Sequence, residues 1–313
     1  MSGLGNRLGE ALVDAGYAAG WGAVKALPEP LARTAFDRAG RWAAGRDGRG
    51  TRQLRANLRV VTGLSGPPLD TLTRDAVRSY ARYWMEAFRL PTLGVPRLLA
   101  GTTVVGSEHL DAARAAGRPV VLALPHSGNW DAAGVWFVDW LGGPFMTVAE
   151  RLRPEALYER FLAYRESLGF RVVPLTGGER PSSAVLAQWL AAGKSACLLV
   201  DRDLSASGIP VTFFGRATTM PGGPALLAAR SGAALLPVVS HFDGGGWRHT
   251  VHPEVDVHGP GRLRDRVHAG MQGVADAFAA SIAARPVDWH QLGRIWADVP
   301  PDPERASRAV APS

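Results

Sequence analysis

A histidine and an aspartate lie five positions apart in the segment VVLALPHSGNWDAAGVWFV, which covers residues 120–138. His126 follows a β-branched apolar run, and Asp131 follows a short polar turn and opens a segment with a helical pattern. A strand that ends at His126 presents its imidazole at a sheet edge, where Asp131 can accept from the ring, fix its tautomer and stabilise the imidazolium. Such a pair is suited to removing a proton from an alcohol.

A second polar cluster, Asp201-Arg202-Asp203, directly follows the apolar run ACLLV. Three successive charged residues at the end of a strand indicate the mouth of a cleft, although a solvated turn has the same composition. In a cleft, Asp201 can bind a sugar hydroxyl or support the histidine, and Arg202 can neutralise a phosphate. The sequence leaves open whether Asp131 or Asp201 governs the proton on His126.

Other candidate residues follow further strand-like runs. Glu150 comes after the run MTVA and Arg165 lies in the next helical segment, so both are expected near the same cleft, with an exposed helix charge as the alternative for Arg165. The glycine-rich segment 210–224 contains no GxGxxG or GKS/T pattern, and we interpret it as a strand-to-helix connection whose amides could also stabilise an anion. His241 and His249 have no carboxylate or cysteine at metal-ligand spacing, so we interpret them as structural rather than as metal ligands.

The elements that must position these residues alternate along the chain. Strands are expected at 102–105, 120–124, 145–148, 171–174, 195–200, 234–239 and 250–257. Helices are expected at 131–141, 154–168, 181–193, 221–231 and 262–284, after an earlier helix in the region 70–100 that ends at Pro91. This alternation predicts an α/β fold with a mixed, largely parallel central sheet flanked by helices.

The domain organisation follows from the flanking segments. We expect an N-terminal amphipathic helical arm over residues 1–60 packed on the core, an α/β domain over 61–298, and a disordered tail over 299–313 that is rich in Pro, Arg and Ala. Aromatic and apolar residues interleaved with arginines in the arm are typical of a helix in a lipid interface, with a helical hairpin that has a solvated basic face as the alternative. No stretch reaches the ~20 apolar residues of a spanning helix and no signal-peptide pattern opens the chain, so a cytosolic or membrane-surface protein is expected.

Composition limits the possible partners. The chain has 313 residues, 46% of them hydrophobic, and a formal net charge of +7. Cys197 is the only cysteine, which excludes an intrachain disulfide and a cysteine-based metal site. The positive net charge favours a polyanionic partner. Nearly all cations are arginines, whose planar guanidinium suits phosphate, but genome composition explains the excess of arginine over lysine equally well. Because aromatics are interleaved with the arginines of the arm, an anionic membrane surface is expected rather than a nucleic acid.

Taken together, these segments resemble a known family. The block HSGNWD matches the H-x4-D motif of glycerolipid-type acyltransferases, and DRDLSASGIPVTFFGRATTMPGGPALLAARSGAALLPVV and PVDWHQLGRIW are similar to later blocks of the bacterial lipid A acyltransferases. Within that family, LPHSGNWDAAG, TVAERLRPEALYERF and LVDRDLS look most like the actinobacterial phosphatidylinositol mannoside acyltransferases. The resemblance covers about residues 20–298, and the ordered set of blocks is far more specific than H-x4-D alone.

The resemblance implies an acyl-CoA-dependent O-acyltransferase that moves a long acyl chain, typically palmitoyl, to a mannose 6-hydroxyl of a phosphatidylinositol mannoside at the inner face of the plasma membrane. It also implies direct transfer without an acyl-enzyme, acyl-CoA as co-substrate, and no metal or redox cofactor. The motifs do not separate this acceptor from a lipid A precursor or a lysophospholipid. They also do not separate acyl-CoA from an acyl carrier protein as the donor.

The resemblance assigns roles to individual residues. It implies His126 as the general base, with Asp131 and Asp201 as its supporting carboxylates. It implies an acceptor pocket lined by charged and polar side chains, namely Glu150, Arg165, Arg202, Asp203 and His290. One departure concerns Asp201, where the mannoside acyltransferases have a longer glutamate.

Overall fold

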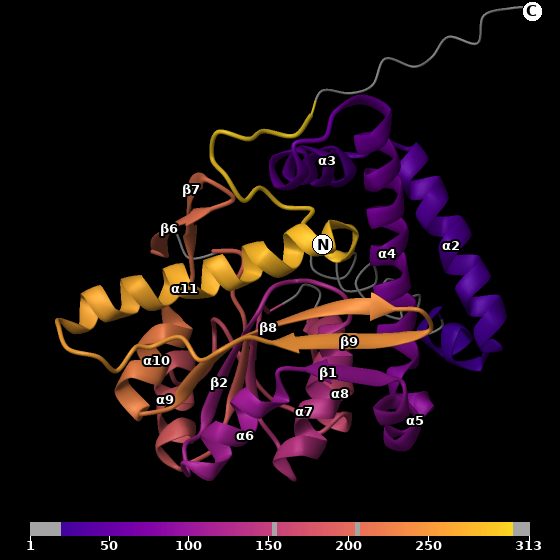
Figure 1. Cartoon of the computed structure of the whole chain (residues 1–313). Helices are drawn as coiled ribbons and strands as arrows, with labels where there is room; N and C mark the ends of the chain where they lie inside the picture. Colours follow the sequence, from indigo (N-terminus) through magenta and orange to yellow (C-terminus); the bar gives the residue numbers. More distant parts are fainter. Residues whose placement is uncertain (1–19, 152–154, 204–206, 303–313) are drawn as a thin grey trace, which may run out of the picture.

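The computed structural model describes residues 20–151, 155–203 and 207–302, and its core is a seven-stranded sheet with the order β1-β9-β8-β2-β5-β3-β4 (Figure 1). Every strand pair in this sheet is parallel except β8 with β9. The strands are β1 (Thr102–Val105), β2 (Val120–Leu124), β3 (Met146–Ala149), β4 (Arg171–Pro174), β5 (Ala196–Leu199), β8 (Ala234–Asp243) and β9 (Gly246–Val251). The predicted α/β class with a mixed, largely parallel sheet is confirmed.

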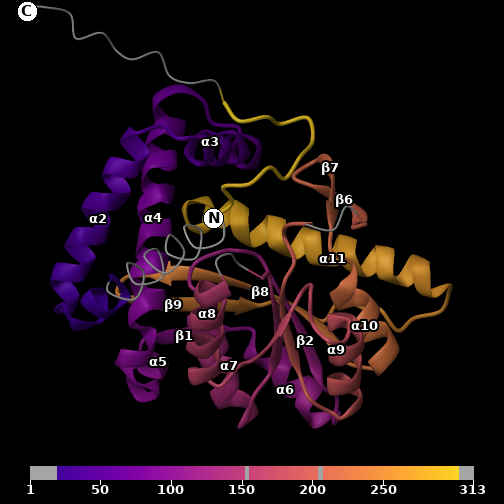
Figure 2. The same ribbon diagram turned by 180° about the vertical axis from the view of Figure 1, so that it is seen from behind.

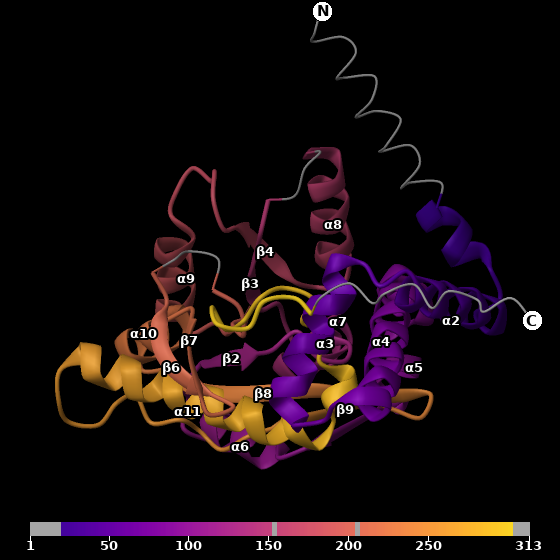
Figure 3. The same ribbon diagram turned by 90° about the horizontal axis from the view of Figure 1, so that it is seen from above.

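Helices cover both faces of the sheet, in agreement with the continuous apolar sequence of β2. Val121 and Ala123 pack with one group of helices, α9 (Ser182–Ala191), α10 (Gly223–Ser231) and α11 (Leu263–Ala284). The alternate residues of β2 pack with α6 (Ser107–Ala115), α7 (Trp130–Leu141) and α8 (Glu155–Ser167). Figures 2 and 3 show α9 and α10 on one side of β2 and α7 and α8 on the other.

Three N-terminal helices form a separate layer beside the turn of the β8–β9 hairpin. They are α2 (Glu29–Gly45), α3 (Arg49–Thr62) and α4 (Gly66–Leu93), and a short α5 (Val95–Ala100) follows. Leu54 and Leu58 of α3 pack against Leu69 and Val77 of α4 in a core of their own. The expected end of the helix at Pro91 is wrong, because α4 continues to Leu93; a proline so near the end interrupts few backbone hydrogen bonds.

The structure differs from the expected elements at two further places. Residues 209–220 form an antiparallel hairpin, β6 (Ile209–Phe213) and β7 (Arg216–Met220), where a strand-to-helix connection was expected. Its turn residues Phe214 and Gly215 both have positive φ, at 51° and 72°, as a tight two-residue hairpin turn requires. The strand expected at 250–257 is instead β9, which begins at Gly246 and pairs with β8.

The two ends of the chain are described only in part. Residues 1–19 of the expected arm and 303–313 of the expected tail lie outside the described residues. Val299 and Asp302, at the start of that expected tail, are buried, and the Asp302 carboxylate accepts from Arg55 and Arg59 of α3. The chain is therefore packed against α3 as far as Asp302.

Three histidines are buried in a neutral state. His249 Nδ1 lies 3.0 Å from the Ser240 hydroxyl, and burial lowers the pKa of His249 to about 3 and that of His241 to about 4. Burial likewise lowers the pKa of His290 to about 3. Within the described parts of the chain, no group of three or more His, Cys, Asp or Glu side chains could hold a metal ion.

These histidines predict a pH dependence of stability. Their folded pKa values lie below the unfolded value near 6.5, so the unfolded chain binds more protons and stability falls as the pH drops below about 6.5. Each histidine contributes a slope of about 1.4 kcal/mol per pH unit until its folded pKa is approached. Urea unfolding at pH 7, 6 and 5 measures this slope. His249→Gln should remove about one histidine's share; an unchanged slope in that variant would contradict the assignment.

Candidate active site

The site is centred on His126, which the end of β2 brings to the same sheet edge as Asp201. Because β2 and β5 are parallel neighbours, the residues that follow them lie side by side. His126 Nδ1 lies 2.6 Å from Asp201 Oδ1, and 37% of the His126 side chain is exposed while that of Asp201 is fully buried. Asp201 therefore contacts the ring, and an aspartate is long enough to do so.

The buried carboxylate of Asp201 is surrounded by N–H donors. Its Oδ2 accepts from the His126 main-chain N–H at 3.1 Å, from Trp289 Nε1 at 3.0 Å and from Gln291 Nε2 at 3.2 Å. Burial by itself raises the pKa of Asp201, but the charge of His126 and the hydrogen bonds from the His126 ring, the Trp289 side chain and the His126 main chain outweigh it and lower the pKa. An ionised carboxylate can only accept, so the neutral ring of His126 carries its proton on Nδ1 and its lone pair on Nε2. That is the tautomer of a general base.

Asp131 lies in the first turn of α7 and does not contact the imidazole. Its Oδ1 accepts from Arg165 Nε at 3.3 Å and its Oδ2 from the Tyr83 hydroxyl at 3.2 Å. Of the two carboxylates that the sequence left open as partners of His126, it is therefore Asp201 that hydrogen-bonds to the ring. Burial raises the pKa of Asp131, against the effect of Arg165. Only 17% of the Arg165 side chain is exposed, and its guanidinium lies over the Trp130 ring. The contacts of Arg165 with Asp131 and Trp130 therefore join α8 to α7.

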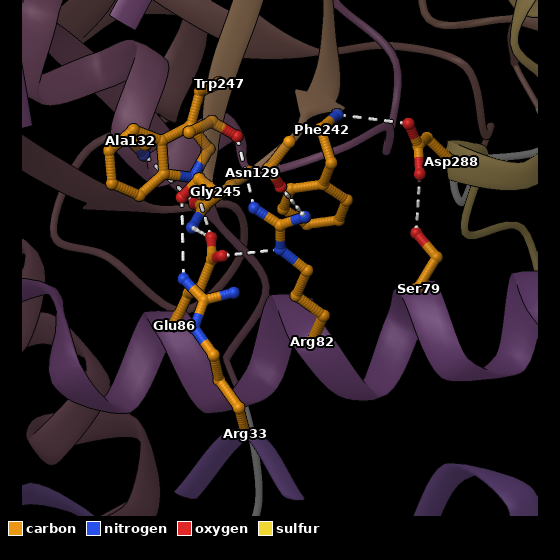
Figure 4. A network of polar contacts seen from close by, with 12 residues as sticks. Arg33, Ser79, Arg82, Glu86, Asn129, Ala132, Phe242, Gly245, Trp247 and Asp288 are labelled. Carbon is orange, nitrogen blue, oxygen red and sulfur yellow. Dashed lines mark hydrogen bonds and ion pairs between the residues drawn. The ribbon is translucent and has the colours of Figure 1, made fainter. Parts of the chain in front are cut away.

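The polar turn between His126 and α7 is held from α4. Asn129 caps α7 by accepting from the Ala132 N–H at 3.0 Å, and its Nδ2 donates to Glu86 at 2.9 Å. The buried carboxylate of Glu86 also accepts from Trp247 Nε1 and Arg82 Nε, each at 2.7 Å (Figure 4). These contacts join the turn to α4 and to the β8–β9 hairpin.

The same turn is held on its other side by the short 3-10 helix η1 (Pro286–Asp288) and the residues that follow it. Gly128 N donates to the Asp288 carbonyl and His290 N donates to the His126 carbonyl, both at 2.8 Å. Gly128 has φ +56°, and a Cβ there would lie 2.6 Å from the Ser240 carbonyl oxygen, so only glycine fits. The Asp288 carboxylate accepts from the Ser79 hydroxyl at 2.7 Å, which fixes this segment to α4 (Figure 4).

Of the four remaining candidates, two form an ion pair and two contact other residues. Arg202 lies 3.5 Å from Glu150, and both side chains are exposed enough to reach a ligand at the edge where β3 and β5 end. Asp203 accepts from the Gly208 N–H and the Thr219 hydroxyl, which ties it to the β6–β7 hairpin. His290 is buried with its Nε2 2.9 Å from the Ser79 hydroxyl.

Sequence reasoning missed the partners of Asp201 other than His126. Trp289 and Gln291 lie 88 and 90 positions beyond Asp201, inside the PVDWHQLGRIW block whose partner no local pattern indicates. Glu86 was missed because a glutamate within a helix is usually a solvent-exposed charge. Only the tertiary structure shows that it is buried and accepts a hydrogen bond from Asn129.

Comparison with known proteins adds to this geometry. The family model described as bacterial lipid A biosynthesis acyltransferase matches residues 8–298. A protein of Mycolicibacterium smegmatis named phosphatidylinositol mannoside acyltransferase is 53% identical over 292 residues, which is 92% of this chain and 93% of that protein. A protein of the same name from Mycobacterium tuberculosis strain H37Rv is 51% identical over 288 residues, or 90% of this chain and 88% of that protein.

The Asp131–Arg165 pair predicts a stability effect. Asp131→Ala leaves the Arg165 guanidinium buried without its carboxylate, and we expect a loss of about 3–5 kcal/mol in the free energy of unfolding. The double variant Asp131→Ala/Arg165→Met should recover most of the loss, because no unpaired charge remains. Urea unfolding followed by tryptophan fluorescence measures both; an Asp131→Ala protein as stable as the wild type would exclude this role.

Proposed function

The chain belongs to the bacterial lipid A biosynthesis acyltransferase family and is an O-acyltransferase, and on this premise we propose its substrates and mechanism. It transfers a long-chain acyl group, such as palmitoyl, from acyl-CoA to a mannose 6-hydroxyl of a phosphatidylinositol mannoside at the inner face of the plasma membrane. The name shared by the two relatives supports this acceptor. The observation that carries the mechanism is the partly exposed His126 ring, hydrogen-bonded through Nδ1 to the fully buried carboxylate of Asp201.

His126 acts as the general base. Its Nε2 takes the proton of the acceptor hydroxyl while the hydroxyl oxygen attacks the thioester carbonyl carbon. The ionised Asp201 stabilises the imidazolium that forms and keeps the ring oriented. The tetrahedral intermediate then collapses with cleavage of the C–S bond, and the imidazolium returns its proton to the departing CoA sulfur. No acyl-enzyme forms in this sequence, since the hydroxyl attacks the donor directly.

The sugar-phosphate headgroup binds at the open sheet edge beside His126. The Glu150 carboxylate can accept from sugar hydroxyls, and the Arg202 guanidinium can bind a phosphate or steady the developing oxyanion. Their mutual contact is long, at 3.5 Å, and both side chains reach solvent, so a ligand can replace it. Arg165, Asp203 and His290 act behind this surface through the contacts that hold the edge in place.

Helix α2 supports attachment to an anionic membrane surface. Leu31 and Trp42 are 57% and 64% exposed, and the Arg46 guanidinium lies over the Trp42 ring. Large apolar side chains combined with arginines are the composition of a helix that lies in a lipid interface. Among the described helices, none has the length and apolar character needed to span a bilayer.

The central prediction concerns His126. His126→Ala should lower acyl transfer by about 10²–10⁴-fold because the general base is lost. His268→Ala, which removes an exposed histidine of α11, is the matched control and should keep wild-type activity. Mass spectrometry of the products from purified protein, palmitoyl-CoA and a phosphatidylinositol mannoside measures both variants. Near-normal transfer by His126→Ala would exclude the mechanism.

The same assay tests the acceptor and the donor. With one labelled acyl-CoA, a panel of phosphatidylinositol mannoside, lysophospholipid and lipid A precursor should yield acylated mannoside. Equal transfer to an acceptor that lacks mannose would favour a different lipid substrate. Faster transfer from an acylated carrier protein than from acyl-CoA would show that the carrier protein, and not acyl-CoA, is the preferred donor.

Membrane attachment is tested with vesicles. The protein should bind vesicles that contain an anionic phospholipid, and binding should weaken as salt is raised. Leu31→Ala/Trp42→Ala should reduce vesicle affinity by at least about tenfold, since two exposed apolar side chains no longer enter the interface. Val105→Ala, an exposed apolar residue of β1, is the control. Equal binding by the double variant and the control would exclude α2 as the contact surface.

A further inference from the structure

We infer that Trp289 and Gln291 are positioning residues for acyl transfer, because their side-chain N–H groups hold the Asp201 carboxylate in place against His126. The inference deepens the proposed function and rests on it, since it assumes that His126 is the base. We do not propose that either residue contacts the substrate, because Trp289 is 0% exposed and Gln291 only 3% exposed. They act on the reaction through Asp201.

The geometry divides the two oxygens of Asp201 between two tasks. Oδ2 accepts three N–H groups, from the His126 main chain, Trp289 Nε1 and Gln291 Nε2. Oδ1 is thereby directed to His126 Nδ1 at 2.6 Å. Rotation of the carboxylate would break three hydrogen bonds at once. Because the Asp201 side chain is fully buried, water cannot easily replace a donor that is lost.

The same short segment also holds the main chain of His126. The His290 N–H donates to the His126 carbonyl at 2.8 Å, and the main chain of Trp289 pairs with that of Ser127 in an isolated antiparallel β-bridge. Residues 289–291 therefore hold the base from its backbone and its partner carboxylate from two side chains. This arrangement separates the two effects, because a conservative change of a side chain leaves the main-chain contacts in place.

Trp289→Phe isolates the indole N–H. The aromatic ring remains in a buried cluster in which Trp289 lies 6.0 Å from Phe213 and 6.2 Å from Trp296, measured between ring centroids. Trp296→Phe is the matched control: Trp296 is also 0% exposed, belongs to the same cluster and donates its Nε1–H to the Phe213 carbonyl at 3.1 Å. Both variants lose the same part of an indole and one hydrogen bond, but only one of those bonds ends on Asp201.

A second variant tests the other donor. Gln291→Glu keeps the size of the side chain and replaces the Nε2 donor with an oxygen that carries or shares a negative charge beside Asp201. This change should disturb the carboxylate more than Trp289→Phe does. The main-chain contacts that fix the segment to His126 do not involve the Gln291 side chain.

The kinetic experiment uses the full chain with palmitoyl-CoA and a phosphatidylinositol mannoside. We expect kcat to fall about tenfold in Trp289→Phe, which corresponds to about 1.4 kcal/mol of transition-state stabilisation, with KM for both substrates unchanged. Gln291→Glu should lower kcat further. Trp296→Phe should stay within about twofold of the wild type, even if its thermal unfolding temperature falls as much as that of Trp289→Phe.

A spectroscopic readout follows the hydrogen bond itself. The His126 Nδ1 proton in a short, charge-assisted bond should give a downfield proton NMR signal, identified by its absence in His126→Ala. Trp289→Phe and Gln291→Glu should shift or broaden this signal, and Trp296→Phe should leave it unchanged.

The inference is overturned if Trp289→Phe and Gln291→Glu keep wild-type kcat and an unaltered signal, or if Trp296→Phe loses as much activity as Trp289→Phe. If Trp289→Phe does not fold, Gln291→Glu decides alone. If the wild-type protein does not acylate the mannoside, the proposed function fails, while the NMR comparison still decides whether these donors hold Asp201 on His126.

Discussion

The charge of one buried carboxylate is the constraint on which the rest of the site depends. Asp201 has no exposed side-chain surface, so its charge is tolerable only where protein N–H groups replace water. Those donors come from distant parts of the chain: the turn after β2, and Trp289 and Gln291 near the C-terminus. The order of strands in the sheet and the path of the C-terminal segment are therefore coupled through a single side chain.

The two aspartates that the motifs single out solve different problems. Asp201 supports the His126 ring, whose side chain is 37% exposed. Asp131, five residues from His126, lies in the first turn of α7, where its carboxylate accepts from Arg165 and Tyr83. Its place in the first turn of α7 also favours a negative charge, because of the helix dipole. The aspartate of the H-x4-D motif thus joins α7 to α8 through Arg165. The imidazole is instead hydrogen-bonded to Asp201, which follows strand β5.

The layer of N-terminal helices contains both α2, the helix proposed to contact lipid, and α4, the helix that supports the candidate active site. Helix α4 contacts the turn that follows His126 through Glu86 and Asn129, and it contacts the C-terminal segment through Ser79 and Asp288. On its other side it packs against α2, whose outer face carries Leu31 and Trp42. Helix α4 thus contacts both the turn that follows His126 and α2, the helix proposed to lie on lipid.

The sequence by itself determined the α/β class, most strands and helices, and the delivery of His126 to a strand end, because hydrophobic periodicity and turn residues act locally. Only the tertiary structure decided which carboxylate meets the imidazole. Asp131 is near in sequence, but Asp201, 75 positions away, is near in space because β5 lies beside β2. Likewise, nothing local indicates that Trp289 and Gln291 donate to Asp201. Strand order and long-range side-chain contacts depend on how the whole chain packs, whereas a sequence pattern reports only the preference of each segment.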